Sequence, residues 1–229
     1  RHPAQVAKIG ESLQSLSDGR LELGLGAGWY SGEHEMFGFK LPENNERLNL
    51  LEEYIQIIKG LWTIDDFSFE GHHYKIKNAS MNPKPTTNIP LIVGGMASRT
   101  IEIATKFGDQ WNGYYLEHDK LKKKLDLIKI FEERFDKSIK KTIMIPFVIE
   151  DSNKNISNHL SNCNKVFSNL PKHIEEWQNL GFLGGNPQEV VEQIQKYKEM
   201  GIDHIILEHL DIENDFSLNN LKENVLTHV

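Results

Sequence analysis

Two glycine-rich segments contain the residues of this sequence whose types and spacing are best suited to hold a ligand. The first segment is Gly24–Gly28, which Trp29 follows, and the second is Gly94–Thr100. Glycine at the end of a strand often marks a place where a ligand comes close to the backbone, because no side chain stands in the way. Both segments are therefore candidates for one binding site.

The second segment has the composition of a phosphate-binding turn. Gly94 and Gly95 let the backbone approach a ligand, and Ser98 and Thr100 fall in the first turn of a predicted helix. Backbone N–H groups are free in a first turn, and the positive end of the helix dipole attracts an anion. The alternative is an ordinary strand-to-helix turn that Ser98 caps, with Arg99 in solvent. The sequence alone supports the two interpretations equally.

The first segment departs from a dinucleotide-binding loop. The pattern Gly-x-Gly-x-x-Gly that begins at Gly24 requires glycine where Trp29 stands, and no helix is predicted to begin at once. Two interpretations remain: the glycines border a ligand, or they only relieve crowding in a strand. Trp29, Trp111 and Tyr114 lie at predicted strand ends, where each is either a core residue or a ring that stacks on a ligand.

Metal and thiol chemistry find little support. His34 and the glutamate after it begin like a zinc-protease helix, but Gly38 stands where the second histidine is needed. The pair His72 and His73 has no third ligand in view. Cys163 is the single cysteine, so it can form no internal disulfide, and no base lies near it in the sequence. We therefore predict no metal site.

The composition limits the classes of function. The chain has 229 residues, of which 38% are hydrophobic and 26% charged, as in a globular domain with a large core. A net charge of −7 argues against a nucleic-acid-binding surface. No apolar run approaches the ~20 residues that a membrane span requires. A single cysteine suits a reducing compartment, so we expect a cytoplasmic protein with a small-molecule partner.

The elements that must position these residues alternate between segments with the hydrophobic pattern of a strand and segments with that of a helix. We expect strands at Leu21–Gly26, Pro90–Gly95, Gln110–Tyr114, Thr142–Ile149 and Ile202–Leu207. We expect helices at Ala4–Leu16, Glu46–Trp62, Ser98–Phe107, Lys120–Phe135, Pro187–Met200 with Asn186 as N-cap, and Ser217–His228.

The intervening segments are less regular. We interpret Trp29–Asn45 as a long functional loop, and we expect a small hairpin whose strands are Phe67–Phe69 and His73–Tyr74. Asp151–Gly185 is predicted to hold helical pieces and a polar loop. Alternation of strands and helices implies a parallel sheet. Such a sheet binds ligands at the carboxyl ends of its strands, and both glycine segments fall at such ends.

Several segments together resemble the luciferase-like family, especially its branch that uses the deazaflavin coenzyme F420. The resemblance covers nearly the whole chain in the family's order, and it is carried by Arg1–Pro3, Leu16–Leu21, Leu23–Trp29, Arg47, Leu51–Glu53, Phe69–Gly71, Tyr74, Pro90–Gly95, Gly108–Asn112 and Asn186–Pro187.

The resemblance implies a (β/α)8 TIM barrel of which this chain, residues 1–229, is a single partial domain. Leu21–Gly26 would be the fourth strand, and the later predicted strands would be the fifth to the eighth. The first three strands would precede Arg1 and are not in this sequence. A barrel without them has two free sheet edges and an open core, so we expect low stability unless a partner or the absent segment closes it.

The resemblance also implies a coenzyme, either F420 or flavin mononucleotide (FMN). Gly26, Ala27, Gly28 and Trp29 would border its ring. The phosphate would lie on the second segment, at Gly94, Gly95, Met96, Ala97, Ser98 and Thr100. The catalytic acid or base is unknown, because in this family it often belongs to the early strands. Glu33 and His34 are the loop groups with suitable chemistry.

Four functions are consistent with these features. The first is hydride transfer between F420 and a small organic substrate. The second is an FMN-dependent monooxygenase that uses reduced flavin and oxygen. The third is an inactive truncated barrel, and the fourth is a sugar-phosphate enzyme on an unrelated barrel that needs only the phosphate turn. Members of the family are often homodimers, which the resemblance implies and the residues do not decide.

Overall fold

The computed structural model describes residues 1–167, 169–211 and 213–229. The chain divides into two compact units. The first unit comprises Arg1–Trp111 and Ile130–Ile139, and the second comprises Asn112–Lys129 and Lys140–Val229. Strand β5 (Gln110–Tyr114) and helix α5 (His118–Phe135) each contribute residues to both units. The prediction of a single barrel domain over residues 1–229 stays a prediction.

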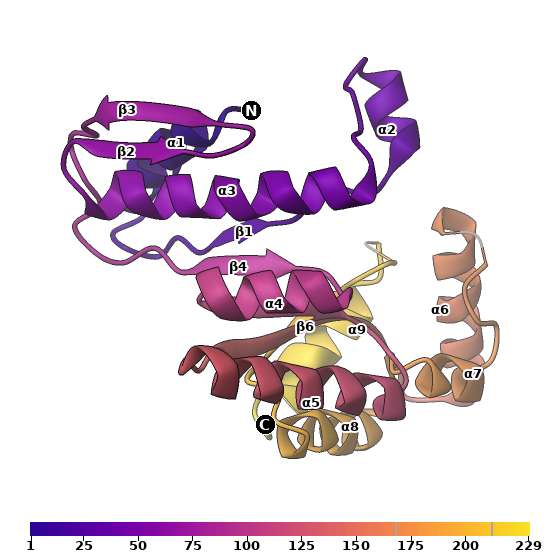
Figure 1. Cartoon of the computed structure of the whole chain (residues 1–229). Coiled ribbons are helices and arrows are strands. Elements are labelled where there is room, and N and C mark those ends of the chain that lie inside the picture. Colours follow the sequence, from indigo (N-terminus) through magenta and orange to yellow (C-terminus); the bar gives the residue numbers. More distant parts are fainter. Residues whose placement is uncertain (168, 212) are drawn as a thin grey trace. The chain divides into compact units, whose positions relative to one another are not determined.

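The first unit alternates helices with short strands (Figure 1). Its elements before β5 are α1 (Pro3–Leu16), β1 (Leu23–Leu25), α2 (Ser31–Met36), α3 (Asn44–Thr63), β2 (Phe67–Glu70), β3 (Lys75–Ala79), β4 (Leu91–Gly94) and α4 (Ser98–Phe107).

Helices α1 and α3 pack directly on one another. The indole Nε1 of Trp62 donates a hydrogen bond to the carbonyl oxygen of Ala7, at 2.9 Å. A Cβ atom on Gly10 would lie 2.9 Å from Cζ2 of Trp62, so the glycine makes room for the indole. The predicted apolar face of α3 is buried, with Leu51 and Ile55 at its centre. The side chain of Gln14 on α1 also accepts from the N–H of Leu21 at 2.9 Å and donates to the carbonyl oxygen of Asn88 at 3.2 Å, so it holds the segments that lead into β1 and β4.

Strands β1 and β4 form the parallel pair that the alternation predicts. Leu23 lies opposite Leu91, and Leu25 lies opposite Val93. Within the described residues, no strand pairs with the second edge of β1, and no ladder closes the strands into a barrel. The first unit therefore presents its glycine segments from two adjacent strands that run in the same direction.

The second unit is built around the long strand β6 (Lys140–Ile149) (Figure 1). Parallel ladders join β6 to β8 (His204–Glu208) along its first half and to β7 (Leu183–Gly185) at its end. The other elements of this unit are α6 (Asn153–Val166), α7 (Ile174–Asn179), α8 (Pro187–Glu199), α9 (Asp215–Asn220) and the π-helical turn η1 (Leu221–Val225).

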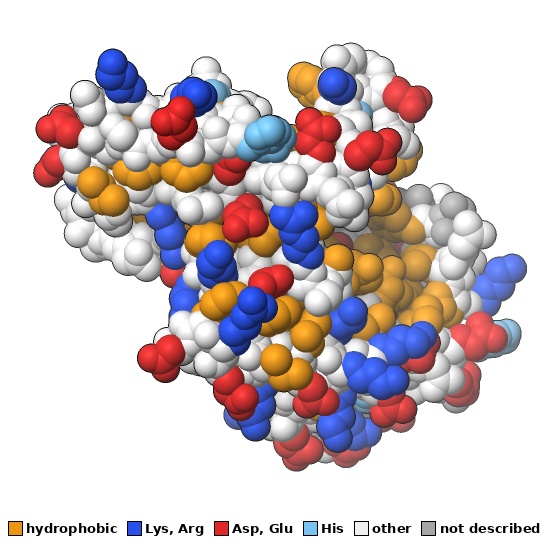
Figure 2. All heavy atoms as spheres, viewed as in Figure 1, with side chains coloured by type: hydrophobic (Ala, Val, Ile, Leu, Met, Phe, Trp, Pro, Cys, Tyr) orange, Lys and Arg blue, Asp and Glu red, His pale blue; other side chains and the backbone are white. Residues whose placement is uncertain are grey.

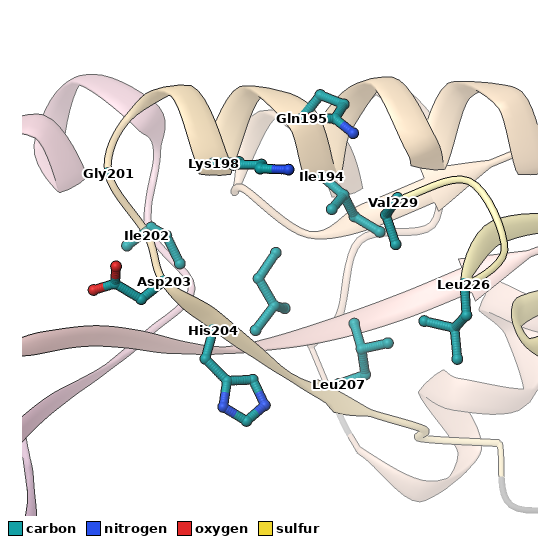
Figure 3. A pocket seen from close by; sticks show the side chains of 11 residues that line it. Ile194, Gln195, Lys198, Gly201, Ile202, Asp203, His204, Leu207, Leu226 and Val229 are labelled. Atoms are coloured by element: carbon teal, nitrogen blue, oxygen red, sulfur yellow. The ribbon is translucent and has the colours of Figure 1, made fainter.

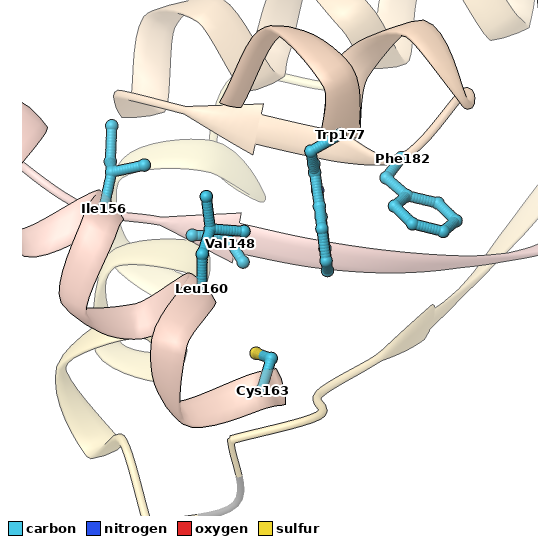
Figure 4. Close-up of a cluster of buried hydrophobic side chains, with 6 residues drawn as sticks. All are labelled: Val148, Ile156, Leu160, Cys163, Trp177 and Phe182. Atoms are coloured by element: carbon cyan, nitrogen blue, oxygen red, sulfur yellow. The ribbon is translucent and has the colours of Figure 1, made fainter. Parts of the chain in front are cut away.

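A buried cluster joins β6, α6 and α7. Figure 4 shows the side chains that form it: Val148, Ile156, Leu160, Cys163, Trp177 and Phe182. Burial, and to a smaller extent the charge of Asp211, raises the pKa of the Cys163 thiol to about 12. The thiol is therefore protonated near neutral pH, as expected for a core residue and not for a nucleophile.

The predicted start of α8 is confirmed in detail. The side chain of Asn186 accepts a hydrogen bond from the backbone N–H of Glu189 at 3.0 Å, and the Glu189 carboxylate accepts one from the N–H of Asn186 at 2.8 Å. Pro187 occupies the first helical position, where its missing N–H costs nothing. This reciprocal capping explains why the sequence alone located the helix.

The predictions for the three irregular segments were wrong in part. The expected loop Trp29–Asn45 contains α2 and the beginning of α3. The second strand of the hairpin is Lys75–Ala79 and not His73–Tyr74. The segment Asp151–Gly185 contains the unpredicted strand β7, whose Leu-Gly-Gly sequence lacks the β-branched residues that identify strands.

The final helix also differs from the prediction. We expected one helix over Ser217–His228, but α9 begins at Asp215 and passes into η1 at Leu221. Asn214 caps α9, because its side chain accepts a hydrogen bond from the N–H of Ser217 at 3.1 Å.

Glu53 on α3 holds the hairpin loop through backbone groups. Its carboxylate accepts hydrogen bonds from the N–H groups of His72 (2.7 Å), His73 (3.0 Å) and Tyr74 (3.0 Å). Burial raises the pKa of Glu53, but these hydrogen bonds and the charge of His73 outweigh it, so the pKa lies below its ordinary value. A Cβ on Gly71 would overlap the carboxylate, which explains the glycine at that position.

We expect Glu53→Gln to lower the free energy of unfolding at neutral pH by roughly 1–3 kcal/mol, because a charged acceptor of several N–H groups is lost. A lowered pKa means that the stabilisation is present above the unfolded carboxyl's pKa and is lost as the pH falls through the folded value. The free energies of unfolding of the wild-type and Glu53→Gln proteins should therefore become equal at acidic pH. Urea unfolding across pH checks this, with Glu133→Gln, an exposed carboxylate on α5, as control. A constant difference at every pH would refute the role of the charge.

Candidate functional site

The structure places the two glycine segments side by side. β1 ends at Leu25 and β4 ends at Gly94, and the parallel register sets Gly26 beside Gly94. A Cβ on Gly26 would lie 3.7 Å from the carbonyl oxygen of Gly94. The expectation that both segments meet at the carboxyl ends of parallel strands is confirmed. Each segment therefore contributes a wall of backbone to the same surface.

Gly95 has a backbone conformation that other residues rarely adopt. Its φ is +140°, and a Cβ there would lie 2.9 Å from Cγ2 of Thr100. Glycine is consequently required for the turn from β4 into α4. The buried Thr100 fixes the turn from inside the first turn of the helix.

The start of α4 has the form of an anion site. Its N-cap is Ala97, which has no side-chain group to accept from the helix, and Ser98 is the first helical residue. The capped-turn alternative, with Ser98 as N-cap, is therefore wrong. The first hydrogen bond of the helix runs from the N–H of Ile101 to the carbonyl of Ala97. The N–H groups before it lie at the positive end of the dipole, where an anion binds favourably.

Arg99 is directed toward α3 and not freely into solvent. Its Nη2 hydrogen-bonds the side-chain oxygen of Asn49 and lies 3.7 Å from a carboxylate oxygen of Glu52. The capped-turn alternative placed Arg99 in solvent, whereas the structure pairs it with residues of α3 in the first unit. Arg99 thus ties the N-terminal end of α4 to α3.

Trp111 holds the glycine turn in place. Its side chain is fully buried, and its Nε1 donates a hydrogen bond to the carbonyl oxygen of Gly95 at 2.8 Å. The core interpretation of Trp111 is confirmed, and the ring does not stack in an open site. Its contribution to the site is to fix the orientation of the Gly95 peptide, which the sequence did not indicate.

The first glycine segment is fixed by Arg47, a residue whose role the sequence reasoning missed. Arg47 Nη1 donates to the carbonyl oxygen of Gly28 at 3.0 Å, and Nη2 donates to the side chain of Asn44 at 3.2 Å. Its Nε is buried and has no hydrogen-bond partner in the described part of the chain. An arginine in the first turn of α3 opposes the helix dipole. That unfavourable placement is the feature that could have drawn attention to it.

Of the two candidate catalytic groups, only His34 lies against the glycine turn. Gly28 has a φ of +75°, and a Cβ there would lie 3.7 Å from the imidazole of His34. The His34 Nδ1 lies 2.9 Å from the carbonyl oxygen of Tyr30, which sets the orientation of the ring. Glu33 is exposed in the first turn of α2, and nothing among the described residues directs its carboxylate to the glycine turn.

Trp29 is a surface residue with 84% of its area exposed, so it is not part of the core. Its ring lies 5.3 Å from that of Tyr30 between centroids. Some hydrophobic side chains are visible on the surface around α2, among acidic and basic ones (Figure 2). Met36, Phe37 and Phe39 each have more than half of their area exposed. The turn of the first segment is thus followed by an apolar, solvent-facing segment. Tyr114, on β5, is also half exposed.

A separate apolar pocket of about 510 Å³ lies in the second unit, between α8, β8 and the C-terminal residues. Ile194, Leu207, Leu226 and Val229 point toward its centre (Figure 3). Its lining is mostly aliphatic and includes Lys198 together with the carboxylate of Asp203. The part of α8 that borders the pocket is its C-terminal half, where the helix dipole disfavours an anion. The glycine segments therefore remain the better candidate for an anionic ligand.

The described residues contain no group of three or more His, Cys, Asp or Glu side chains that could hold a metal ion. The rings of His72 and His73 are 5.0 Å apart, and their backbone N–H groups serve the Glu53 carboxylate. Among the described helices, none is long and apolar enough to cross a membrane.

Comparisons with known proteins agree on one family. The family model described as luciferase-like monooxygenase matches residues 1–204. An FMNH2-dependent dimethylsulfone monooxygenase of Pseudomonas fluorescens (strain Pf0-1) is 25% identical over 93% of this chain and 66% of its own. An F420-dependent glucose-6-phosphate dehydrogenase of Amycolatopsis mediterranei (strain U-32) is 23% identical over 98% of this chain and 74% of its own. The chain thus spans about two thirds to three quarters of these relatives.

The similarity extends to solved structures. The structure of an F420-dependent secondary alcohol dehydrogenase, bound to an F420–acetone adduct, superposes with a TM-score of 0.82. It is 19% identical and covers 99% of this chain and 75% of its own. This likeness shows the fold: an α/β architecture with a parallel sheet, as in the barrels of that family.

Proposed function

Because the chain belongs to the luciferase-like monooxygenase family, we propose that its paired glycine segments bind a coenzyme with a flavin-type ring and a phosphate. We propose further that the protein is an oxidoreductase that transfers a hydride between coenzyme F420 and a small organic substrate. The observation that carries the proposal is the placement of Gly26 beside Gly94, next to a helix start without a capping side chain.

The residues present fit the phosphate of such a coenzyme. The N–H groups of Ser98, Arg99 and Thr100 lie at the start of α4, and the glycine at position 95 lets the chain turn into that helix start with the Thr100 side chain packed against it. Hydrogen bonds from N–H groups to phosphate oxygens are charge-assisted and stronger than neutral ones. Trp111 keeps the Gly95 peptide fixed, so that little conformational freedom is lost there when the ligand binds.

The first segment suits the ring. Gly26, Ala27 and Gly28 present backbone without bulky side chains, and Arg47 holds the carbonyl of Gly28. When bound, the coenzyme supplies the chemistry of accepting or donating a hydride. His34 beside Gly28 is the group placed to give or take the accompanying proton. The apolar side chains around α2 would exclude water from this surface.

An FMN-dependent monooxygenase is the second candidate, and the similarity to the FMNH2-dependent relative favours it. Both functions use a ring and a phosphate, so the glycine segments serve either one. They differ in what the coenzyme reacts with: an organic hydride donor or acceptor for F420, and molecular oxygen for reduced FMN.

Parallel fluorescence titrations of this chain with F420 and with FMN separate the two candidates. We expect saturable binding of F420 with a Kd at least about tenfold below that of FMN, a difference of about 1.4 kcal/mol. Tighter binding of FMN, together with oxygen consumption by the reduced complex, would favour the monooxygenase. Binding of neither coenzyme would contradict both and leave the inactive barrel and the sugar-phosphate enzyme.

A further inference from the structure

A buried polar cluster in the second unit joins two helices to the carboxyl end of β6. Glu150 follows β6, His159 lies on α6, and Asn214 precedes α9. A carboxylate oxygen of Glu150 lies 3.0 Å from Nδ1 of His159, and it accepts a hydrogen bond from the amide nitrogen of Asn214 at 2.8 Å. Asn214 also caps α9, because its side-chain oxygen accepts from the N–H of Ser217. The cluster therefore fixes α6 and α9 to the same strand end.

A second histidine stands beside the first. His209 directly follows β8, and its ring is edge-on to that of His159, with 6.1 Å between the centroids. The side chain of His159 has no accessible area. The Nε2 atoms of both histidines are buried and have no hydrogen-bond partner in the described part of the chain. While the cluster is closed, neither Nε2 meets water or an acceptor among the described residues.

This environment disfavours the charged form of both rings. The neutral ring of His159 can hold its proton on Nδ1, as donor to Glu150, or on Nε2, with Nδ1 as acceptor from the Asn214 amide at 3.1 Å. The charged ring has an N–H at both positions, so its Nε2–H is a buried donor without an acceptor within the described residues. An unsatisfied buried donor costs more when it belongs to a charged group.

The charges around the two rings compensate for burial only in part. Glu150 and Asp211 favour a proton on His159, but burial outweighs them, and the pKa of His159 lies below its ordinary value. Burial also lowers the pKa of His209, and the neighbouring His159 adds to the effect. The titratable groups on the elements around the rings are Glu150 and the exposed Asp151 after β6, Asp211 after β8, Asp215 on α9, the protonated Cys163 thiol on α6, and the exposed Glu175 and Glu176 on α7.

We propose that this cluster is an acid-sensitive lock, in which proton uptake by His159 and His209 at mildly acidic pH releases α6 and α9 from the end of β6. Because both pKa values are lowered in the closed state, the attachment is complete above the value of a free histidine, about 6.5, and weakens as the pH falls below it. The lock lies wholly in the second unit and does not depend on the coenzyme.

The size of the effect follows from the number of protons that opening takes up. A free histidine goes from mostly neutral to mostly protonated between about pH 7.5 and about pH 5.5. Each histidine that is protonated only in the open state raises the equilibrium constant for opening about tenfold over this range. Two such histidines should raise it about a hundredfold.

Amide hydrogen exchange of the whole chain at these two pH values, corrected for the intrinsic exchange rates, measures the opening. The protection factors in α6 and α9 are expected to fall about a hundredfold on acidification. Those in α8, a helix of the same unit outside the cluster, are expected to stay nearly unchanged. Unchanged protection in α6, or an equal fall in α6 and α8, would overturn the proposal.

Glutamine variants assign the effect to the two rings. Glutamine is neutral at both pH values, so His159→Gln and His209→Gln should each reduce the change in α6 to about tenfold, and the double variant should abolish it. His173→Gln removes an exposed histidine at the start of α7 and should keep the full wild-type change. If His159→Gln does not fold, His209→Gln against His173→Gln decides: an equal pH dependence in these two variants would refute the lock.

Discussion

A Ser98→Asp variant is expected to lose about 10- to 100-fold in affinity for a phosphate-bearing coenzyme. Ser98 is the exposed first residue of α4, so the substitution does not disturb the core. A carboxylate there interacts favourably with the helix dipole, by about 0.3–1 kcal/mol, so the thermal midpoint should stay the same or rise. The same carboxylate repels a phosphate and competes for the N–H groups. Binding and stability are thus expected to change in opposite directions.

The comparison of FMN with riboflavin isolates the contribution of the phosphate to the binding affinity. Riboflavin lacks that group, so its affinity should be nearly equal in the Ser98→Asp and wild-type proteins, while that for FMN falls. Ser98→Asn, which has the same shape without the charge, should bind FMN almost as the wild type does. If Ser98→Asp lowers the affinity for FMN and for riboflavin equally, or lowers neither, the phosphate does not bind at the start of α4.

Trp111→Phe is expected to lower both stability and coenzyme affinity. The change keeps an aromatic ring in the core but removes the Nε1–H that holds the carbonyl oxygen of Gly95. Loss of a buried hydrogen bond leaves the acceptor unsatisfied, at a cost of about 1–3 kcal/mol. Trp111→Ala should cost about 3–5 kcal/mol, since it also opens a cavity. Urea unfolding and coenzyme titration give the two values for each variant.

The second unit supplies a matched control for this prediction. Trp177 is equally buried, and its Nε1 donates to the carbonyl oxygen of Leu183 at 2.9 Å. Trp177→Phe therefore has the same chemistry and should cost a similar free energy of unfolding, but it should leave coenzyme affinity unchanged. If both variants weaken the coenzyme equally, the effect of Trp111 reflects general stability and not the position of Gly95.

The sequence predicted the adjacency of the glycine segments because that adjacency follows from local patterns. Two apolar runs that end in glycine, each followed by a helix or loop, are enough to identify parallel strands. Helix boundaries were predicted best where the cap lies in neighbouring residues, as at Asn186 and Pro187. These features depend on the chain within a few residues of the site.

The residues that fix the segments could not be predicted in this way. Arg47 and Trp111 act on carbonyl groups 19 and 16 positions away in the chain, so their partners depend on how the helices and strands pack. α2 escaped prediction because it is only six residues long, lacks a side-chain cap and has no buried face. β7 escaped because two of its three residues are glycine.

The amide chemical shifts of the labelled protein, recorded while F420 or FMN is added, test the central claim most directly. If the glycine segments form the coenzyme site, the largest shifts should fall on the N–H groups of Gly26–Gly28 and Gly94–Thr100, and they should saturate together with the fluorescence signal. Riboflavin should reproduce the shifts of the first segment but not those of Ser98 and Thr100. Saturable shifts that leave both segments unchanged would contradict the account.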